Sequence, residues 1–305
     1  SRHAIGAIRK WADPSLININ WAGTAEFLSV VENFQPAVNF GTLVGYGTLR
    51  RSIIGDEARS LIPEELSGMK FLLQEALREG AFGLSLGLSY GHERVSTAEE
   101  IIELARTVAQ YGGIIKIHLR SEGKEILASV NEAIRIGREA GVSVQISHLK
   151  AIGRKAWPSL PKALELIQYA RSSGVDINFD VSPYSTTGSP LYALLPGWSR
   201  EGGFTKLLER LKDERMRQRI ELELKEYTLH YDRILIIAAK PSSIAGHTVA
   251  DVAEHTGVPP ERAILDVLSA SQGRVTIVGR TVSARNTRIA LADPNAIAAS
   301  DGFGT

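Results

Sequence analysis

The chain has 305 residues, of which 44% are hydrophobic, and it carries 35 basic against 34 acidic side chains. This composition suits one large α/β domain or two smaller ones, and the near-zero net charge excludes the strong basic field by which proteins attract nucleic acids or anionic membranes. Cysteine is absent, so His, Asp, Glu or a modified Lys would have to hold any metal. No apolar run could span a membrane and no signal peptide is recognisable at the start, so we expect a cytoplasmic protein.

Short β-branched runs alternate with longer amphipathic runs along much of the chain. The alternation predicts strands at 38–44, 80–87, 114–118, 144–148 and 175–181, with helices at 63–78, 96–111, 124–140 and 159–173. Such a pattern is typical of a parallel sheet. No Gly-rich phosphate-binding motif opens these helices, and polar residues recur at the ends of several strands. We therefore predict a (β/α)8 TIM-like barrel rather than an open doubly wound sheet.

Residues 191–229 interrupt this rhythm with a highly charged, helix-periodic stretch. We interpret it as a helical insertion that packs over one rim of a barrel formed by residues 1–305. The barrel pattern is expected to resume with strands and helices at 234–239, 248–256, 260–271, 275–278 and 296–299.

Two of the expected strands end in histidine, at His118 and His148. Barrel enzymes keep their chemistry at the carboxyl ends of strands, and neutral imidazole is a good zinc ligand. A single histidine there is more often a hydrogen-bonded structural residue, and the pair leaves both interpretations open. Asp301, in an SDG turn after the last strand, is either a turn former or the carboxylate that carries a proton from water to a leaving nitrogen. His92 is either structural or a substrate contact.

Several longer segments resemble one enzyme family. The runs GLSLGLSYGHERVSTAEE, IIKIHLRSEG, VQISHLK, DVSPYSTTGSPLYALLPGW and SDG are similar to the N-acyl-D-amino-acid deacylase (D-aminoacylase) branch of the amidohydrolase superfamily. The resemblance implies a distorted (β/α)8 barrel with a smaller β domain. It also implies zinc, one or two ions, and hydrolysis of the amide of N-acyl-D-amino acids to a carboxylate and a free D-amino acid.

The same resemblance implies roles for individual residues. His118 and His148 would bind zinc, and Asp301 would act as general base and acid. The substrate, a small N-acyl amino acid, would be the partner, with neither nucleic acid nor membrane involved. The residues expected to orient the site or contact this substrate are Arg120, Lys150, Tyr184 and Ser189.

This sequence also departs from the family pattern. The family's H-x-H pair, its metal-binding cysteine and its His-Pro-Arg segment are absent from these residues. We therefore expect an incomplete barrel, a piece of a longer family member, that holds zinc poorly and is inactive by itself. Tyr46 stands where most members have His and Ser182 where many have Tyr, and we expect these two changes to alter pocket polarity. Leu86 stands where Thr is usual, and we expect that change to affect which substrate is accepted.

Two alternatives remain beside the deacylase. One is an amidohydrolase that acts on cyclic amides, like dihydroorotase or hydantoinase, and such enzymes bridge two metals with a carboxylated lysine. Lys116 is the only lysine inside an expected strand, but it precedes His118 by two residues on that same strand, which argues against this reaction. The other alternative is an inactive barrel fragment that only binds a ligand.

Overall fold

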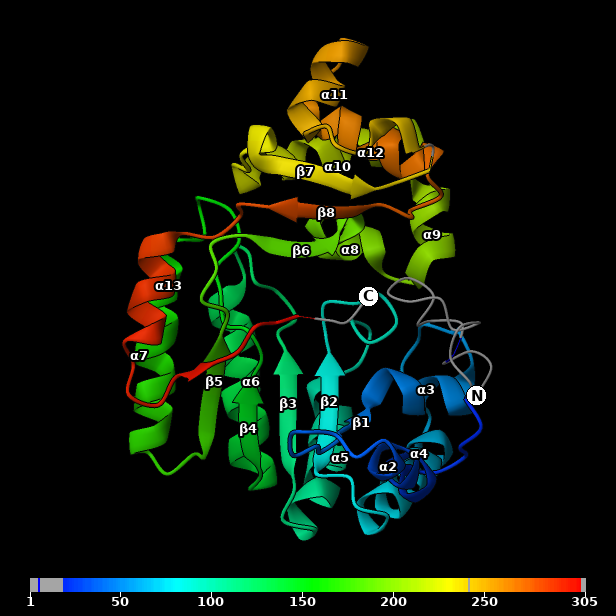
Figure 1. Ribbon diagram of the computed structural model, residues 1–305, viewed down its shortest axis with the longest axis vertical. Coiled ribbons are helices and arrows are strands. Elements are labelled where there is room, and N and C mark those ends of the chain that lie inside the picture. The colour runs from blue at the N-terminus through cyan, green and yellow to red at the C-terminus, as the bar shows by residue number, and fades with distance from the viewer. Residues whose placement is uncertain (1–4, 6–18, 241, 303–305) are drawn as a thin grey trace.

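The computed structural model describes residues 5, 19–240 and 242–302 and arranges them in two layers (Figure 1). The lower layer in this view is a parallel sheet in the order β1-β2-β3-β4-β5-β9. Its strands are β1 (Val44–Gly45), β2 (Gly83–Gly87), β3 (Ile114–His118), β4 (Ser143–Ile146), β5 (Ile177–Val181) and β9 (Ile297–Ala298). β1 to β5 follow one another in chain order with helices between them, and the sheet does not close within the described residues. The expected α/β barrel is thus confirmed as a partial one.

Helices of the lower layer pack side by side along this sheet. They are α2 (Thr24–Asn33), α3 (Tyr46–Ile54), α4 (Pro63–Arg78), α5 (Ala98–Gln110), α6 (Ile126–Ala140), α7 (Ser159–Ser172) and α13 (Ala284–Leu291). Their starts follow local rules: α4 begins at a proline with two acidic residues in its first turn, and the Thr97 hydroxyl accepts a hydrogen bond from the backbone N–H of Glu100 at the start of α5. α4 and β3 have the predicted bounds.

The two faces of the parallel sheet differ in polarity. Ile115 and Ile117 of β3 are buried in the core formed with the helices. Because side chains alternate along a strand, Lys116 and His118 lie on the opposite face. Leu86 of β2 is buried in the core on the helix side of the sheet. The presence of Leu instead of the family's usual Thr at this position therefore affects core packing. The polar face is therefore the one available for a site.

The upper layer is a separate antiparallel sheet in the order β6-β8-β7, covered by short helices (Figure 1). Its strands are β6 (Thr187–Pro190), β7 (Ile234–Ala238) and β8 (Thr276–Gly279). The helices are η2 (Leu191–Leu194), α8 (Gly197–Arg200), α9 (Gly203–Arg210), α10 (Glu214–Tyr227), η3 (Tyr231–Arg233), η4 (Ser242–Ile244), α11 (Val249–Thr256) and α12 (Pro260–Ala270). This layer has an apolar core of its own, centred on residues such as Leu191, Ile220 and Ile264.

This arrangement corrects one prediction. The segment 191–229 is largely helical, as expected, but the strands expected at 234–239 and 275–278 do not continue the parallel sheet. They pair antiparallel with each other, and β8 also pairs with β6. A short apolar run predicts a strand without indicating its partner, and β6 has the sequence TGSP, which lacks the β-branched signal of a strand. No helix among the described residues has the length and apolarity to cross a membrane.

A buried polar cluster joins α3 to the start of α5. Arg50 is fully buried, and its Nη1 lies 2.6 Å from Glu100 Oε1. The Tyr46 hydroxyl contacts Glu100 and Ser96, and burial raises the pKa of Tyr46 above its usual range, so it stays a neutral donor. Tyr46 was expected to alter the polarity of the pocket. It lies instead inside this cluster, where a phenol can reach a carboxylate.

We predict that Glu100→Leu lowers the free energy of unfolding by about 3–5 kcal/mol, because it leaves the Arg50 guanidinium buried without its anion. Adding Arg50→Met should restore most of that loss, since the double variant contains no unpaired charge. Urea unfolding of both variants and of Arg50→Met alone measures the coupling. Additive losses in the double variant would contradict this account.

Candidate metal centre

A cavity of about 330 Å³ lies between the two layers. Ser89, His118 and His148 line it from the carboxyl ends of the parallel strands, and Ser189 and Arg200 line it from the upper layer. Because the carboxyl ends of parallel strands meet at one edge of a sheet, the polar face described above opens into this space.

His148 is presented by a strained turn. β4 ends at Ile146, two residues earlier than predicted, and His148 has a φ of 39°, which is unusual for a residue other than glycine. Its backbone N–H donates to Asp180 Oδ1 at 2.7 Å, and the N–H of Leu149 donates to the Asp180 carbonyl at 2.8 Å. Lys116 Nζ donates to Asp180 Oδ2 at 2.9 Å. Burial works against the charged form of Asp180, but these donors outweigh it and lower its pKa.

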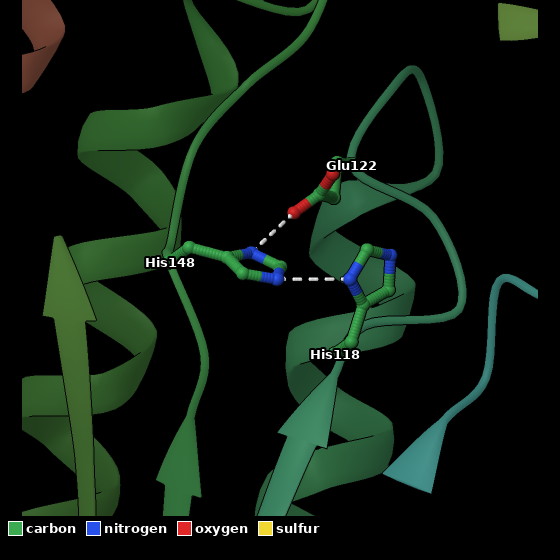
Figure 2. A group of neighbouring side chains, drawn as sticks. All are labelled: His118, Glu122 and His148. Atoms are coloured by element: carbon green, nitrogen blue, oxygen red, sulfur yellow. Dashed lines mark hydrogen bonds and ion pairs between the residues drawn. The ribbon is translucent and has the colours of Figure 1, made fainter. Parts of the chain in front are cut away.

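The two imidazoles face each other (Figure 2). His118 Nδ1 lies 2.9 Å from His148 Nε2, and the rings are 4.6 Å apart at 75°. On its other side, His118 Nε2 lies 2.7 Å from Ser89 Oγ, and Tyr90 stacks on the ring. Burial lowers the pKa of His118 to about 3, so at neutral pH the ring is uncharged and can offer a lone pair to a cation.

Glu122 completes the group and was missed from the sequence. Its Oε1 lies 3.0 Å from His148 Nδ1, and one ligand atom from each of Glu122, His118 and His148 lies within 4.8 Å of the others. Burial opposes its ionisation, but the Lys150 ammonium and the two imidazoles outweigh that and hold the pKa of Glu122 well below its usual range. The available signal was an acidic residue four positions after a strand-end histidine, inside HLRSEG.

The expected basic residues have different surroundings. Lys150 lines the cavity, and its Nζ lies 2.9 Å from Glu122 Oε1 and 2.8 Å from His148 Nδ1. Arg120 was expected to help orient the site or bind the substrate carboxylate. Its Nε and Nη2 donate to Glu132, and its remaining bonds go to the carbonyls of Arg94 and Ser96. These bonds hold the loop after β3 against α6. Arg120 also lines the cavity, so its expected role stays a prediction.

The remaining predicted residues divide into two groups. Asp301 lines the cavity with a φ of 53° and an exposed side chain, and Ser189 of β6 lines it from the upper layer. Tyr184 is 60% exposed and is not among the residues that line the cavity. The structure therefore leaves Tyr184 outside the cavity and brings the other predicted site residues to it: His118, Arg120, His148, Lys150, Ser189 and Asp301.

Lys116 does not resemble a metal-bridging lysine. Its ammonium is paired with the Asp180 carboxylate, which itself holds the His148 turn. Carboxylation would place a second negative charge beside Asp180, where like charges repel. The structure thus offers no support for the cyclic-amide alternative at this residue.

His92 has a structural environment. It is 5% exposed, lies outside the cavity lining, and has its Nε2 3.1 Å from the Gly55 carbonyl. Its buried Nδ1 has no hydrogen-bond partner among the residues that the structure describes. Burial, with Arg51 and Arg50 adding to it, lowers the pKa of His92 to about 4. The ring of the folded protein is therefore uncharged at neutral pH.

We predict a pH-dependent stability contribution from His92. Its folded pKa of about 4 lies below the ordinary 6.5, so the unfolded chain binds the proton first as pH falls. The contribution is complete above pH 6.5 and is lost, by about 2–3 kcal/mol, as pH falls to 4. Urea unfolding of the wild type and of His92→Gln, which keeps an N–H donor for Gly55, should show this slope in the wild type alone. Identical slopes would contradict it.

The sequence and structure of this chain were compared with those of known proteins. No protein-family model matches it. It is 38% identical over 160 residues to a D-aminoacylase of Alcaligenes xylosoxydans xylosoxydans, a match that covers 52% of this chain and 33% of that protein. It is 34% identical over 164 residues to an N-acyl-D-glutamate deacylase of the same organism, covering 54% and 34%. A solved D-aminoacylase structure, described as having a binuclear metal centre, matches with a TM-score of 0.72 and 26% identity over 92% of this chain and 52% of that one.

This chain is similar to proteins of the D-aminoacylase family. This confirms the resemblance stated from the sequence, and the structural match confirms the amidohydrolase-type barrel. The matched region covers about a third of each curated D-aminoacylase relative, and the structural match covers about half of the solved D-aminoacylase.

Proposed function

We propose that the whole protein to which these residues belong hydrolyses N-acyl-D-amino acids with the help of zinc, releasing a carboxylate and a free D-amino acid. The observation that carries the proposal is the facing pair of imidazole nitrogens, His118 Nδ1 and His148 Nε2, in a cavity at the carboxyl ends of the parallel strands. Two relatives are a D-aminoacylase and an N-acyl-D-glutamate deacylase, and a solved D-aminoacylase has a binuclear metal centre, which supports the same reaction class.

The donor set fits zinc. Zinc–nitrogen distances of about 2.0–2.1 Å at a tetrahedral angle place two ligand nitrogens roughly 3.3 Å apart. The 2.9 Å between His118 Nδ1 and His148 Nε2 is within a few tenths of an ångström of that, so a slight opening of the rings would admit the ion. Catalytic zinc sites commonly combine histidines with a carboxylate and an open position for water.

Glu122 fits the role of an orienting carboxylate better than that of a ligand. It contacts Nδ1 of His148, the nitrogen that faces away from His118 (Figure 2). A cation placed between Glu122 and that nitrogen would have to displace the Lys150 ammonium, which touches both. His148 Nδ1 has a donor, Lys150 Nζ, and an acceptor, Glu122 Oε1, within reach. In the tautomer in which Nδ1–H donates to Glu122, the Nε2 lone pair is free for a metal. Carboxylate–histidine pairs of this kind fix the tautomer in many zinc sites.

The chain's own groups then supply the rest of the reaction. A bound zinc ion would polarise the amide carbonyl and make a water molecule acidic near neutral pH. The Asp301 carboxylate, exposed in the cavity, would accept the proton from that water and deliver it to the departing amino nitrogen. Lys150 and Ser189 would contact the substrate from opposite sides of the cavity.

We predict that Glu122→Gln weakens zinc binding by about 10–100-fold, because the amide can donate to His148 Nδ1 and favour the tautomer that lacks a free Nε2 lone pair. Competition with a chromophoric chelator measures the affinity. Glu125→Gln is the matched control, since Glu125 also lines the cavity but contacts neither imidazole. His148→Ala should bind zinc more weakly still. Wild-type affinity in His148→Ala would rule out the ligand assignment and favour a barrel that only binds organic ligands.

We predict that Asp301→Asn, in a protein carrying the whole family domain, lowers kcat by about 10²–10⁴-fold and leaves the zinc content unchanged, since it removes a proton carrier. Released amine should be measured with N-acetyl derivatives of D- and L-amino acids. Activity on the D series alone is the expected wild-type result. Near-normal turnover of Asp301→Asn would remove this residue from the role.

A further inference from the structure

Arg200 is a buried cation without an anion. It ends α8 in the upper layer, lines the cavity and is 9% exposed. Its guanidinium forms no hydrogen bond or ion pair with any residue of the described ranges, and its Nε is buried without a partner. Burying an unpaired charge is costly in free energy, so a buried charge without a partner in the protein usually binds a ligand.

The neighbours of Arg200 do not compensate its charge. Burial lowers its pKa to about 10 and Arg94 contributes in the same direction, so Arg200 remains protonated at neutral pH. The groups that favour the cation are the phenols of Tyr192, Tyr227 and Tyr90, which are themselves neutral at that pH. No carboxylate appears among the main groups that act on it.

The other largely buried cations of the cavity are matched. Arg120 pairs with Glu132, and Lys150 pairs with Glu122. Arg94 lies 3.6 Å from Glu201 and donates to the Arg120 carbonyl. Each of these positive groups therefore has its negative partner within the protein, whereas Arg200 retains an unused charge that faces the cavity.

The backbone of Arg200 is held close to the imidazole pair. A side chain at Gly91 would come within 2.0 Å of the Arg200 carbonyl oxygen, so the loop after β2 and the end of α8 touch here. Tyr90 in that loop stacks on His118, and Arg200 acts electrostatically on both Tyr90 and His118. An anion bound by Arg200 would thus lie beside the candidate metal centre.

We propose that Arg200 binds a carboxylate of the substrate, so that this unpaired guanidinium, and not Arg120, selects N-acyl amino acids over neutral amides. The proposal rests on the proposed function for the identity of the ligand. Guanidinium and carboxylate match in geometry through paired N–H donors, and both are desolvated in this cavity. The carboxylate is either the α-carboxylate shared by all such substrates or an acidic side chain.

Binding to this chain tests the proposal without requiring turnover. Calorimetry would compare N-acetyl-D-leucine, N-acetyl-D-glutamate and N-acetyl-D-leucinamide on the wild type, Arg200→Met and the exposed-charge control Arg154→Met. Arg200→Met should weaken binding of at least one acid by tenfold or more and leave the amide unchanged. An equal loss for both acids identifies the α-carboxylate, and a loss confined to the glutamate derivative identifies the side chain.

Three results would overturn the proposal. The first is that Arg200→Met binds the acids as tightly as the wild type does. The second is that Arg200→Met loses as much affinity for N-acetyl-D-leucinamide as for the acids. The third is that the wild type itself binds the acids no more tightly than the amide. Thermal unfolding separates binding from folding, because deleting an unpaired buried charge should maintain or raise the Tm of Arg200→Met, whereas a structural arginine would lower it. Failure of zinc binding with retained Arg200-dependent acid binding would reject the proposed function and leave this inference standing.

Discussion

The site depends on the hydrogen bonds that Asp180 accepts from the turn after β4. One carboxylate oxygen accepts the His148 backbone N–H and the other accepts the Lys116 ammonium, so strands β3, β4 and β5 are tied together at their carboxyl ends. Without that acceptor the positive φ of His148 would be unfavourable for a non-glycine residue. With it, the imidazole is turned toward His118 instead of continuing the alternation of the strand.

Several charged side chains around the cavity are paired with groups of opposite charge. Glu122 is ionised because Lys150 and the imidazoles outweigh the cost of its burial, and Arg120 is fixed by Glu132 in the adjoining loop. Burial, with the nearby Lys150 and Arg200 cations adding to it, outweighs the opposite effect of Glu122 and keeps the His118 ring uncharged and able to bind a cation. The unmatched charge of Arg200 stands out against this background, on the wall contributed by the upper layer.

The upper layer shows how far sequence patterns reach. Residues 234–238 and 276–279 form strands close to where their apolar runs predicted them, yet they pair antiparallel over the barrel. The direction in which two strands pair depends on which of their faces must be buried together. Here the strands of the upper layer bury their apolar faces in a core that they share with the surrounding helices. The same layer supplies Ser189, which the family resemblance indicated, and Arg200, which the sequence analysis missed.

The sequence by itself determined the local elements of the lower layer, the strand ends that carry His118 and His148, and the relation to the D-aminoacylases, because hydrophobic period, capping residues and motif spacing are written along the chain. Only the tertiary structure decided which polar side chains meet. Glu122 and Arg200 line the same cavity, the guanidinium of Arg120 pairs with Glu132 at its edge, and Tyr46 and His92 lie in buried surroundings outside the lining. Hydrogen bonds and desolvation act between residues distant in sequence, so the partner of each buried charge is fixed only when the layers pack.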